Sequence, residues 1–434
     1  MELKKVDEKK KKKKGSVGGA IGLIIGTTIG SGILALPIKT SPAGLLPSSI
    51  SLTVCWAFLL VEALLLVEIN VGLMNKKKKK FNENEDELEE IISIKTMAQE
   101  TLGDWGAILV TFTYIFFGYS SMVAYCSKSG EILNRLTNLP QSLSAFFFTV
   151  LFTILVSVGG TRTTDQINRW LTASMIGLLV GIEVLAFASG SGLAGFEDGG
   201  DWAKVPEAIP VMIFSLVYHD LAPVLCAYLG GDIGRIRTSI LVGSVVPLLT
   251  LLAWNAIALG LFAQTDQLNA DPVDLLLSVR WSGVPLMVEA FSLLAVGTSL
   301  IGTLLSFSEF LKEQITNSTT LREKIEDNMS FSLMKWWKRR RSKIRSIAAT
   351  SIIVAPSLLI STMFPDAFST ATNIAGGYCM TMLYGILPPA MAWAAISKEE
   401  RNNGLSWSRP AIIGVGLVAC TVVAEQILQD LALI

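Results

Sequence analysis

Long apolar segments constrain the fold of this chain more than any other feature of its sequence. A helix needs about 20 apolar residues to cross the hydrocarbon core of a bilayer, which is about 30 Å thick. In that core only helices and closed barrels satisfy their own backbone polar groups. Eleven segments suit such a helix: residues 17–38, 48–74, 105–132, 143–158, 170–190, 206–229, 238–263, 284–310, 346–363, 370–396 and 410–431. The sequence therefore predicts an all-α membrane protein with about eleven transmembrane helices.

The positions of Lys and Arg test this number of spans independently. Membrane proteins keep an excess of these residues in the loops that are not translocated. With eleven spans, the basic tail 1–15 and every second loop after it lie on one side, and that side holds 31 of the 36 Lys and Arg residues. We therefore expect the amino terminus on the cytosolic or stromal side. The plastid envelope, the plasma membrane and other organelles all stay open, and a net charge of zero gives no indication of a nucleic-acid partner.

Two loops on the same side, 75–103 and 311–345, are long and highly charged. The first carries a lysine block followed by an acidic block, and the second ends in a run of Lys, Trp and Arg. Such loops favour a solvated position near anionic lipid headgroups over a regulatory docking site.

The first span contains residues that weaken a helix. Glycines recur at every fourth position from Gly18 to Gly30, which by itself indicates a close contact with a neighbouring helix. Hydroxyl residues and a further glycine crowd the same positions at mid-membrane, where they compete for the helix carbonyls. We therefore expect a break between Gly26 and Gly32. Backbone freed at this depth is tolerated where it lines a cavity or binds a ligand.

The sixth span places the only histidine, His219, next to Asp220 in the middle of the membrane. Ionisable groups there are costly and usually functional. Pro223 follows within one turn, so we expect a second break between Ser215 and Asp220. A neutral histidine bonded to a neighbouring helix is the alternative interpretation.

The two breaks lie five spans apart, in the first and the sixth, which is typical of an inverted repeat of five helices and five helices. The expected transporter domain, 16–434, then contains a first repeat at 17–190, a second at 206–396 and an extra helix at 410–431. The substrate site is expected where the broken helices meet. Half-helix amide ends bind a carboxylate and carbonyl ends bind an ammonium or a cation, which suits an amino acid zwitterion.

The residues from Gly26 to Pro37 resemble the first-helix signature of the hydroxy and aromatic amino acid permease family, which contains the bacterial tyrosine- and tryptophan-specific permeases. Residues 208–219 and 231–237 resemble the sixth helix of that family and the loop after it. The resemblance implies the leucine-transporter fold of the amino acid-polyamine-organocation superfamily and proton-driven uptake of tyrosine or tryptophan. Asp220 and Lys128 stand where small residues are expected. Met175 occupies the fifth-helix position that is a coupling lysine in several relatives, which excludes coupling by such a lysine.

The candidate residues fall into three groups. Proton coupling is expected at His219, because the unperturbed pKa of a histidine is about 6.5. We expect the neighbouring Asp220 to tune this pKa. Thr298 and Ser299 in the eighth span, with carbonyls of the first, are the alternative site for Na⁺. The residues expected to bind substrate are Gly26, Thr27, Thr28, Gly30, Ser31, Gly32, Ser215, Tyr218 and Tyr119.

Further polar or aromatic groups in the spans have less specific expectations. Tyr114 and Tyr125, like Tyr119, are expected either to stack on an aromatic substrate or to serve packing. Lys128 is expected to form a local ion pair with Glu131 and to reach the membrane interface. Glu62 and Glu183 are expected to face protein or water rather than lipid.

The sequence thus predicts a secondary active transporter for tyrosine or tryptophan, working by proton symport and alternating access. A sodium-coupled or facilitative transporter of other neutral amino acids is the alternative. A channel is disfavoured because no short pore element repeats. An enzyme is disfavoured because one histidine and scattered thiols form no catalytic cluster. The expected partners are the amino acid, a coupling ion and the lipid bilayer, with no cofactor and no metal.

Overall fold

The computed structural model describes residues 15–81, 91–188, 200–263, 283–323, 349–398 and 408–432. All regular structure within these ranges is helical. Nine helices there are long and apolar enough to cross a membrane, and a bent pair, Val17–Thr28 with Gly32–Thr40, makes a tenth. The shorter apolar helix Ala349–Met363 falls on the remaining predicted segment. The predicted all-α membrane architecture is therefore confirmed, with nine to ten candidate spans and one shorter apolar helix among the described residues.

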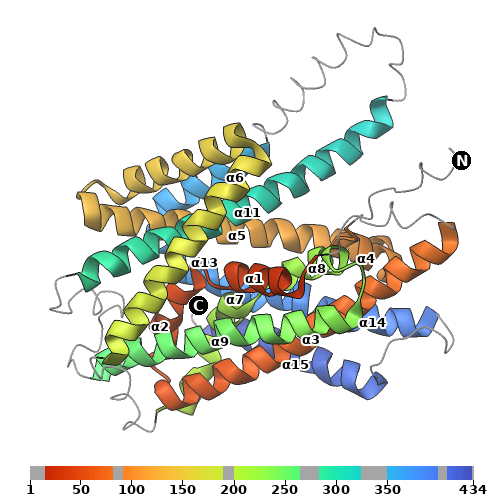
Figure 1. Ribbon diagram of the computed structural model, residues 1–434, viewed down its shortest axis with the longest axis horizontal. Helices are drawn as coiled ribbons and strands as arrows, with labels where there is room; N and C mark the ends of the chain where they lie inside the picture. The colour runs from red at the N-terminus through yellow and green to blue at the C-terminus, as the bar shows by residue number, and fades with distance from the viewer. Residues whose placement is uncertain are drawn as a thin grey trace, which may run out of the picture.

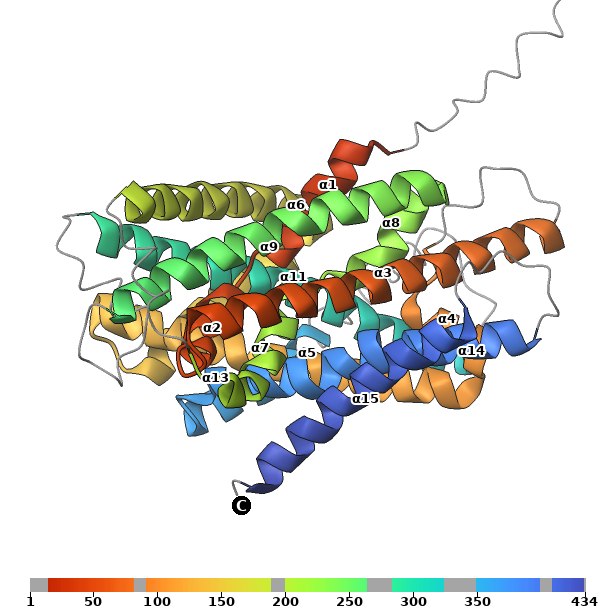
Figure 2. The same ribbon diagram turned by 90° about the horizontal axis from the view of Figure 1, so that it is seen from below.

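The helices form one bundle with two interrupted spans at its centre. In Figure 1 the short helices α1, α2, α7 and α8 lie between α5, α6 and α11 on one side and α3 and α9 on the other. Figure 2 shows α15 crossing the outside of the bundle. The bounds are α1 Val17–Thr28, α2 Gly32–Thr40, α3 Leu45–Phe81, α4 Ile94–Leu102, α5 Asp104–Thr137, α6 Gln141–Ala188, η3 Trp202–Lys204, α7 Val205–Leu216, η4 His219–Leu221, α8 Ala222–Tyr228, α9 Ile233–Ala263, α11 Val284–Glu323, α13 Ala367–Ile374, η5 Ala375–Ile386, α14 Leu387–Lys398 and α15 Arg409–Ala432.

The first span breaks where the glycines and hydroxyl residues predict it. Helix α1 ends at Thr28, Ile29 is extended, and α2 begins at Gly32 with its axis turned by 56°. The hydroxyls of Thr27 and Thr28 bond back to the carbonyls of Leu23 and Ile24, each at 2.8 Å. These bonds compete with the helix at its last turn and favour its end there.

The sixth span is also interrupted. Helix α7 ends at Leu216, Val217 is extended, and a single 3-10 turn precedes α8. Pro223 lies in the first turn of α8, where a missing N–H costs no intrahelical bond, so it begins this helix instead of kinking one. Both predicted breaks are therefore present.

The two breaks touch through a glycine. A Cβ atom on Gly32 would lie 2.9 Å from both the Cα and the Oγ of Ser215. Only a residue without a side chain allows this approach of α2 to α7.

The tenth span contains a π-helix that the sequence did not predict. Twelve residues, Ala375–Ile386, wind as a π-helix between α13 and α14. Such segments are rare and are often found at functional sites. The backbone of Gly376 lies against the carbonyl of Pro210 in α7, and Thr381 donates to the Gly376 carbonyl at 2.8 Å. The π-helix therefore packs directly on the broken sixth span.

Ionisable groups inside the spans turn toward protein. Lys128 bonds Glu131 at 2.8 Å, which confirms the predicted ion pair. The expectation that Lys128 reaches the interface is wrong, because it is 1% exposed and its Nζ lies 5.3 Å from the ring centroid of Phe368. Glu62 is fully buried and faces protein, as expected, whereas Glu183 is half-buried.

Candidate functional site

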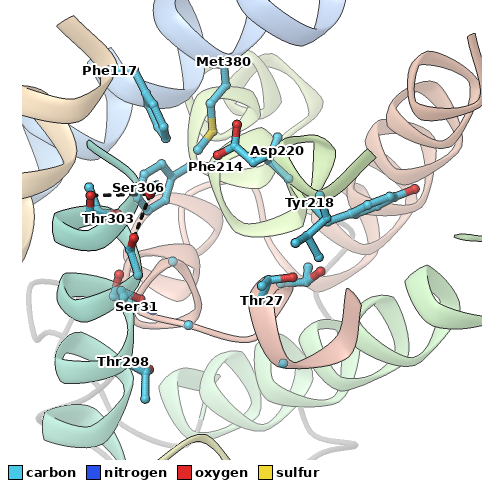
Figure 3. Close-up of a pocket in the computed structure, with 18 of the residues that line it drawn as sticks. Thr27, Ser31, Phe117, Phe214, Tyr218, Asp220, Thr298, Thr303, Ser306 and Met380 are labelled. Atoms are coloured by element: carbon cyan, nitrogen blue, oxygen red, sulfur yellow. Dashed lines mark hydrogen bonds between the residues drawn. The ribbon is translucent and has the colours of Figure 1, made fainter. Parts of the chain in front are cut away.

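A cavity of about 370 Å³ lies where the two interrupted spans meet (Figure 3). Its volume is in the range of pockets that hold small molecules. Six elements or segments contribute to its wall: residues 26–32 of the first span, Tyr114, Phe117, Gly118 and Tyr125 of α5, Asn168 of α6, Phe214, Val217, Tyr218, Asp220, Leu221 and Val224 of the sixth span, Thr298, Ser299, Gly302, Thr303, Ser306 and Phe307 of α11, and Met380 of η5.

The break in the first span presents backbone polar groups to this cavity. The last carbonyls of α1 and the first amides of α2 have no partner within their own helices. One of these amides, that of Ser31, donates to the Ser299 hydroxyl at 2.9 Å. The carbonyl end carries partial negative charge and the amide end partial positive charge, so the break offers both polarities at one place.

Aromatic side chains form another part of the wall. Phe117, Phe214 and Phe307 come from three different helices, and Phe117 and Phe214 lie with Met380 around one end of the space in Figure 3. Tyr114 has its ring centroid 6.1 Å from that of Phe117 and 6.5 Å from that of Phe307. Walls of this kind suit a planar apolar group.

Hydroxyl groups lie beside the aromatic wall. The Tyr125 phenol lies among the hydroxyls of Ser31, Ser121 and Thr303. Ser306 stands beside the phenol of Tyr114. The cavity therefore combines an aromatic surface with hydrogen-bonding groups that can fix the orientation of a ligand.

His219 and Asp220 point in different directions. Asp220 lines the cavity and accepts a hydrogen bond from the Tyr384 hydroxyl of η5. His219 is fully buried behind the wall, with its Nε2 2.9 Å from the Leu59 carbonyl of α3. Because a carbonyl only accepts, this nitrogen is the donor. The ring stacks between Tyr218 and Tyr384, at centroid distances of 5.1 and 5.2 Å.

The hydroxyls proposed for sodium lie on the cavity wall next to the first break. Thr298 donates to the Leu294 carbonyl of its own helix at 2.9 Å, as membrane hydroxyls commonly do. Its oxygen lies 3.7 Å from the sulfur of Met175 in α6. The side chain that the fifth span places beside Thr298 is thus a thioether and not an ammonium.

The structure brings together ten of the thirteen candidate residues: Gly26, Thr27, Thr28, Gly30, Ser31, Gly32, Tyr218, Asp220, Thr298 and Ser299. Three lie outside the cavity wall, and His219 is one of them. Ser215 bonds the Val211 carbonyl of its own helix at 2.8 Å, behind Gly32. Tyr119 is turned away on α5 and donates to the Ile352 carbonyl at 3.0 Å.

Sequence reasoning missed the apolar wall and part of α11. Phe117, Phe214, Phe307 and Met380 look like ordinary residues of a membrane helix. Positions 298, 299, 302, 303 and 306 form a stripe of small and hydroxyl residues at helical spacing. That stripe could have indicated the contribution of α11 to the cavity, because it continues from the predicted Thr298 and Ser299 along one face of the helix.

Comparison with known proteins gives a consistent result. The model of the tryptophan/tyrosine permease family matches residues 12–425. The tyrosine-specific transport system 2 of Haemophilus influenzae is 27% identical and is aligned over 86% of this chain and 87% of its own length. The tryptophan-specific transport protein of Pseudomonas aeruginosa is 24% identical and is aligned over 96% of this chain and 95% of its own length. A protein of Aliivibrio fischeri named glutamine transporter 2 is 23% identical and is aligned over 69% of this chain and 76% of its own length.

A solved structure confirms the fold. The crystal structure of MhsT in complex with L-phenylalanine superposes with a TM-score of 0.60, over 96% of this chain and 99% of that chain, at 14% identity. The chain therefore has the predicted leucine-transporter-like fold.

Proposed function

Because the chain belongs to the tryptophan/tyrosine permease family, we propose that it is a secondary active transporter that moves tyrosine or tryptophan across its membrane by alternating access. The observation that carries this proposal is the cavity at the meeting point of the two breaks, with its aromatic wall. Family membership and the fold support an aromatic amino acid as the substrate.

The polar ends of the half-helices suggest how the amino acid is held. Its carboxylate lies at the amide end of α2, around Gly32, and its ammonium at the carbonyl end of α1, around Gly26 to Thr28. The ring then extends between Phe117, Phe214 and Phe307. In this arrangement the backbone of the protein binds the zwitterion, and the side chains select the ring.

Contacts at one end of the bundle support an inward-facing state. The wall residues of α5, from Tyr114 to Tyr125, and of α11, from Thr298 to Phe307, lie around the middle of their helices, and the lysine-rich loops adjoin one end of these helices. At the other end, the Ser127 hydroxyl and the Gln141 amide both donate to the Pro365 carbonyl and join α5 and α6 to the segment before α13. We assign these contacts to the closed outer side, and the amino terminus to the cytosolic or stromal side.

For the coupling ion we propose a proton bound at His219. Its Nε2 is held by Leu59, while the buried Nδ1 has no hydrogen-bond partner among the described residues. A second proton at Nδ1 would give an imidazolium, and histidine is the side chain whose charge changes over a physiological pH gradient. Tyr384 stacks on His219 and bonds Asp220, so the charge of the histidine is linked to a residue of the cavity wall.

Sodium is the second candidate. Thr298 and Ser299 both line the cavity beside the carbonyl end of α1, and these oxygens are ligands that Na⁺ accepts. One relative is named glutamine transporter 2, and on this ground another neutral amino acid is the alternative substrate.

Uptake into proteoliposomes tests these proposals. Radiolabelled tyrosine or tryptophan is offered with a pH gradient or a sodium gradient imposed separately. We expect accumulation with the pH gradient alone. His219→Ala should abolish that accumulation and keep exchange of internal for external substrate. Tyr119→Phe is the matched control, because Tyr119 lies outside the cavity. Pure sodium dependence, or unchanged pH-driven uptake by His219→Ala, would overturn the proton proposal.

A further inference from the structure

Asp220 is the one charged residue among the described residues that line the cavity. Although it lies in the middle of the sixth span, it is exposed, because its side chain borders the open space. Its neighbours in Figure 3 are Phe214 and Met380, which are 7% and 6% exposed. A carboxylate at an aromatic and thioether wall is an unusual choice, since these apolar neighbours offer it no hydrogen bond.

Tyr384 holds this carboxylate in place. The Tyr384 hydroxyl donates to Oδ1 of Asp220, and Tyr384 itself is completely buried in the π-helix η5. An ionised carboxyl group accepts up to about four hydrogen bonds, so one donor leaves it with acceptor capacity toward the cavity. The acid is therefore positioned and incompletely satisfied, on the same side of the cavity as the aromatic wall.

We propose that Asp220 selects substrates whose aromatic ring carries a hydrogen-bond donor, the phenol O–H of tyrosine or the indole N–H of tryptophan. The inference rests on the proposed transport of an aromatic amino acid through this cavity. A ring donor gives the carboxylate a charge-assisted hydrogen bond. A bare phenyl ring displaces water from the carboxylate and leaves it without a replacement, so a site of this kind rejects the analogue that lacks the donor.

The first test changes the substrate and leaves the protein unaltered. In proteoliposomes, inhibition of labelled tyrosine uptake is measured for tyrosine, phenylalanine and O-methyltyrosine, and for tryptophan and 3-benzothienylalanine, in which sulfur replaces the indole N–H. We expect each analogue without a donor to bind at least about tenfold more weakly than its partner. Equal inhibition within both sets would overturn the inference while leaving the transport proposal intact. Absence of uptake for every aromatic amino acid would instead refute the transport proposal.

The second test changes the residue. Asp220→Leu should bring the ratio of tyrosine to phenylalanine affinity toward one, by weakening tyrosine and not phenylalanine. Tyr384→Phe keeps the carboxylate but removes the hydroxyl that positions it, so it should weaken the preference for tyrosine only in part. Stabilisation of the purified protein against heat by each amino acid gives the same ratios without transport. An equal loss of both affinities in Asp220→Leu would show that the acid binds the ammonium group shared by all substrates, and would overturn the inference.

Discussion

The amide of Ser31 donates a 2.9 Å hydrogen bond to the hydroxyl of Ser299, and this bond fixes the broken first span against α11. Gly30 lies at the same contact, where a Cβ atom would be 2.7 Å from the Ser299 oxygen. The absence of a side chain at residue 30 is therefore a condition for the bond.

Gly30→Ala should lower transport at least about tenfold, because an overpacked contact costs about 1–3 kcal/mol or displaces the break. Ser299→Ala removes the clashing oxygen, so the double variant should recover part of the loss, although the bond to Ser31 is absent. Initial uptake rates and Km of the two single variants and the double variant measure this coupling. Simple addition of the two losses would show that the contact does not limit transport.

Gly32→Ala should be more damaging than any substitution earlier in the first span. Its Cβ would meet the Cα of Ser215 at 2.9 Å, and backbone cannot move aside as a flexible side chain does. Gly22→Ala is the matched control, since nothing lies within 4 Å of a Cβ there. We expect strong loss of substrate binding for the first variant and near-normal uptake for the second. Similar behaviour of the two would contradict the close approach of α2 to α7.

Both interruptions of the bundle could be predicted from the sequence, because their causes are local. Glycines and hydroxyl residues weaken the first span, and Pro223 starts a new helix in the sixth. The rotation of each helix could not be predicted. Ser215 and Phe214 are adjacent, and only the second faces the cavity. Tyr114 and Tyr125 line it while Tyr119, on the same helix, does not.

The same limit applies to the pair in the sixth span. His219 and Asp220 are neighbours in the sequence, yet one bonds α3 and the other borders the cavity. The direction of each is set by contacts with Leu59 and Tyr384, which lie 160 and 164 residues away along the chain. The π-helix that carries Tyr384 shows no pattern in the sequence that separates it from an α-helix.

Removal of the acid from the Lys128 and Glu131 pair should destabilise the protein more than removal of the base. Glu131→Gln leaves an ammonium that is 1% exposed without this counter-charge. For a buried pair this costs roughly 3–5 kcal/mol, and the half-exposed position of Glu131 places the expected loss at the lower end. Lys128→Met removes the buried charge itself and should cost less.

Thermal unfolding of the purified variants measures this order. Glu207→Gln is the control, because it breaks the exposed pair of Lys204 and Glu207 and should leave the midpoint unchanged. A lower midpoint for Lys128→Met than for Glu131→Gln would show that Lys128 stabilises α5 through other contacts.

Glu62→Gln separates two positions for the coupling proton. Glu62 is fully buried in α3, and neither of its carboxyl oxygens has a hydrogen-bond partner among the described residues. It lies three residues after Leu59, on the helix face that receives His219. An amide of the same shape carries no charge, so the substitution should leave the thermal midpoint unchanged or raise it. If the proton binds at His219, pH-driven accumulation should also persist. Retained substrate exchange with loss of pH-driven accumulation in Glu62→Gln, together with normal accumulation in His219→Ala, would place the proton on Glu62 instead.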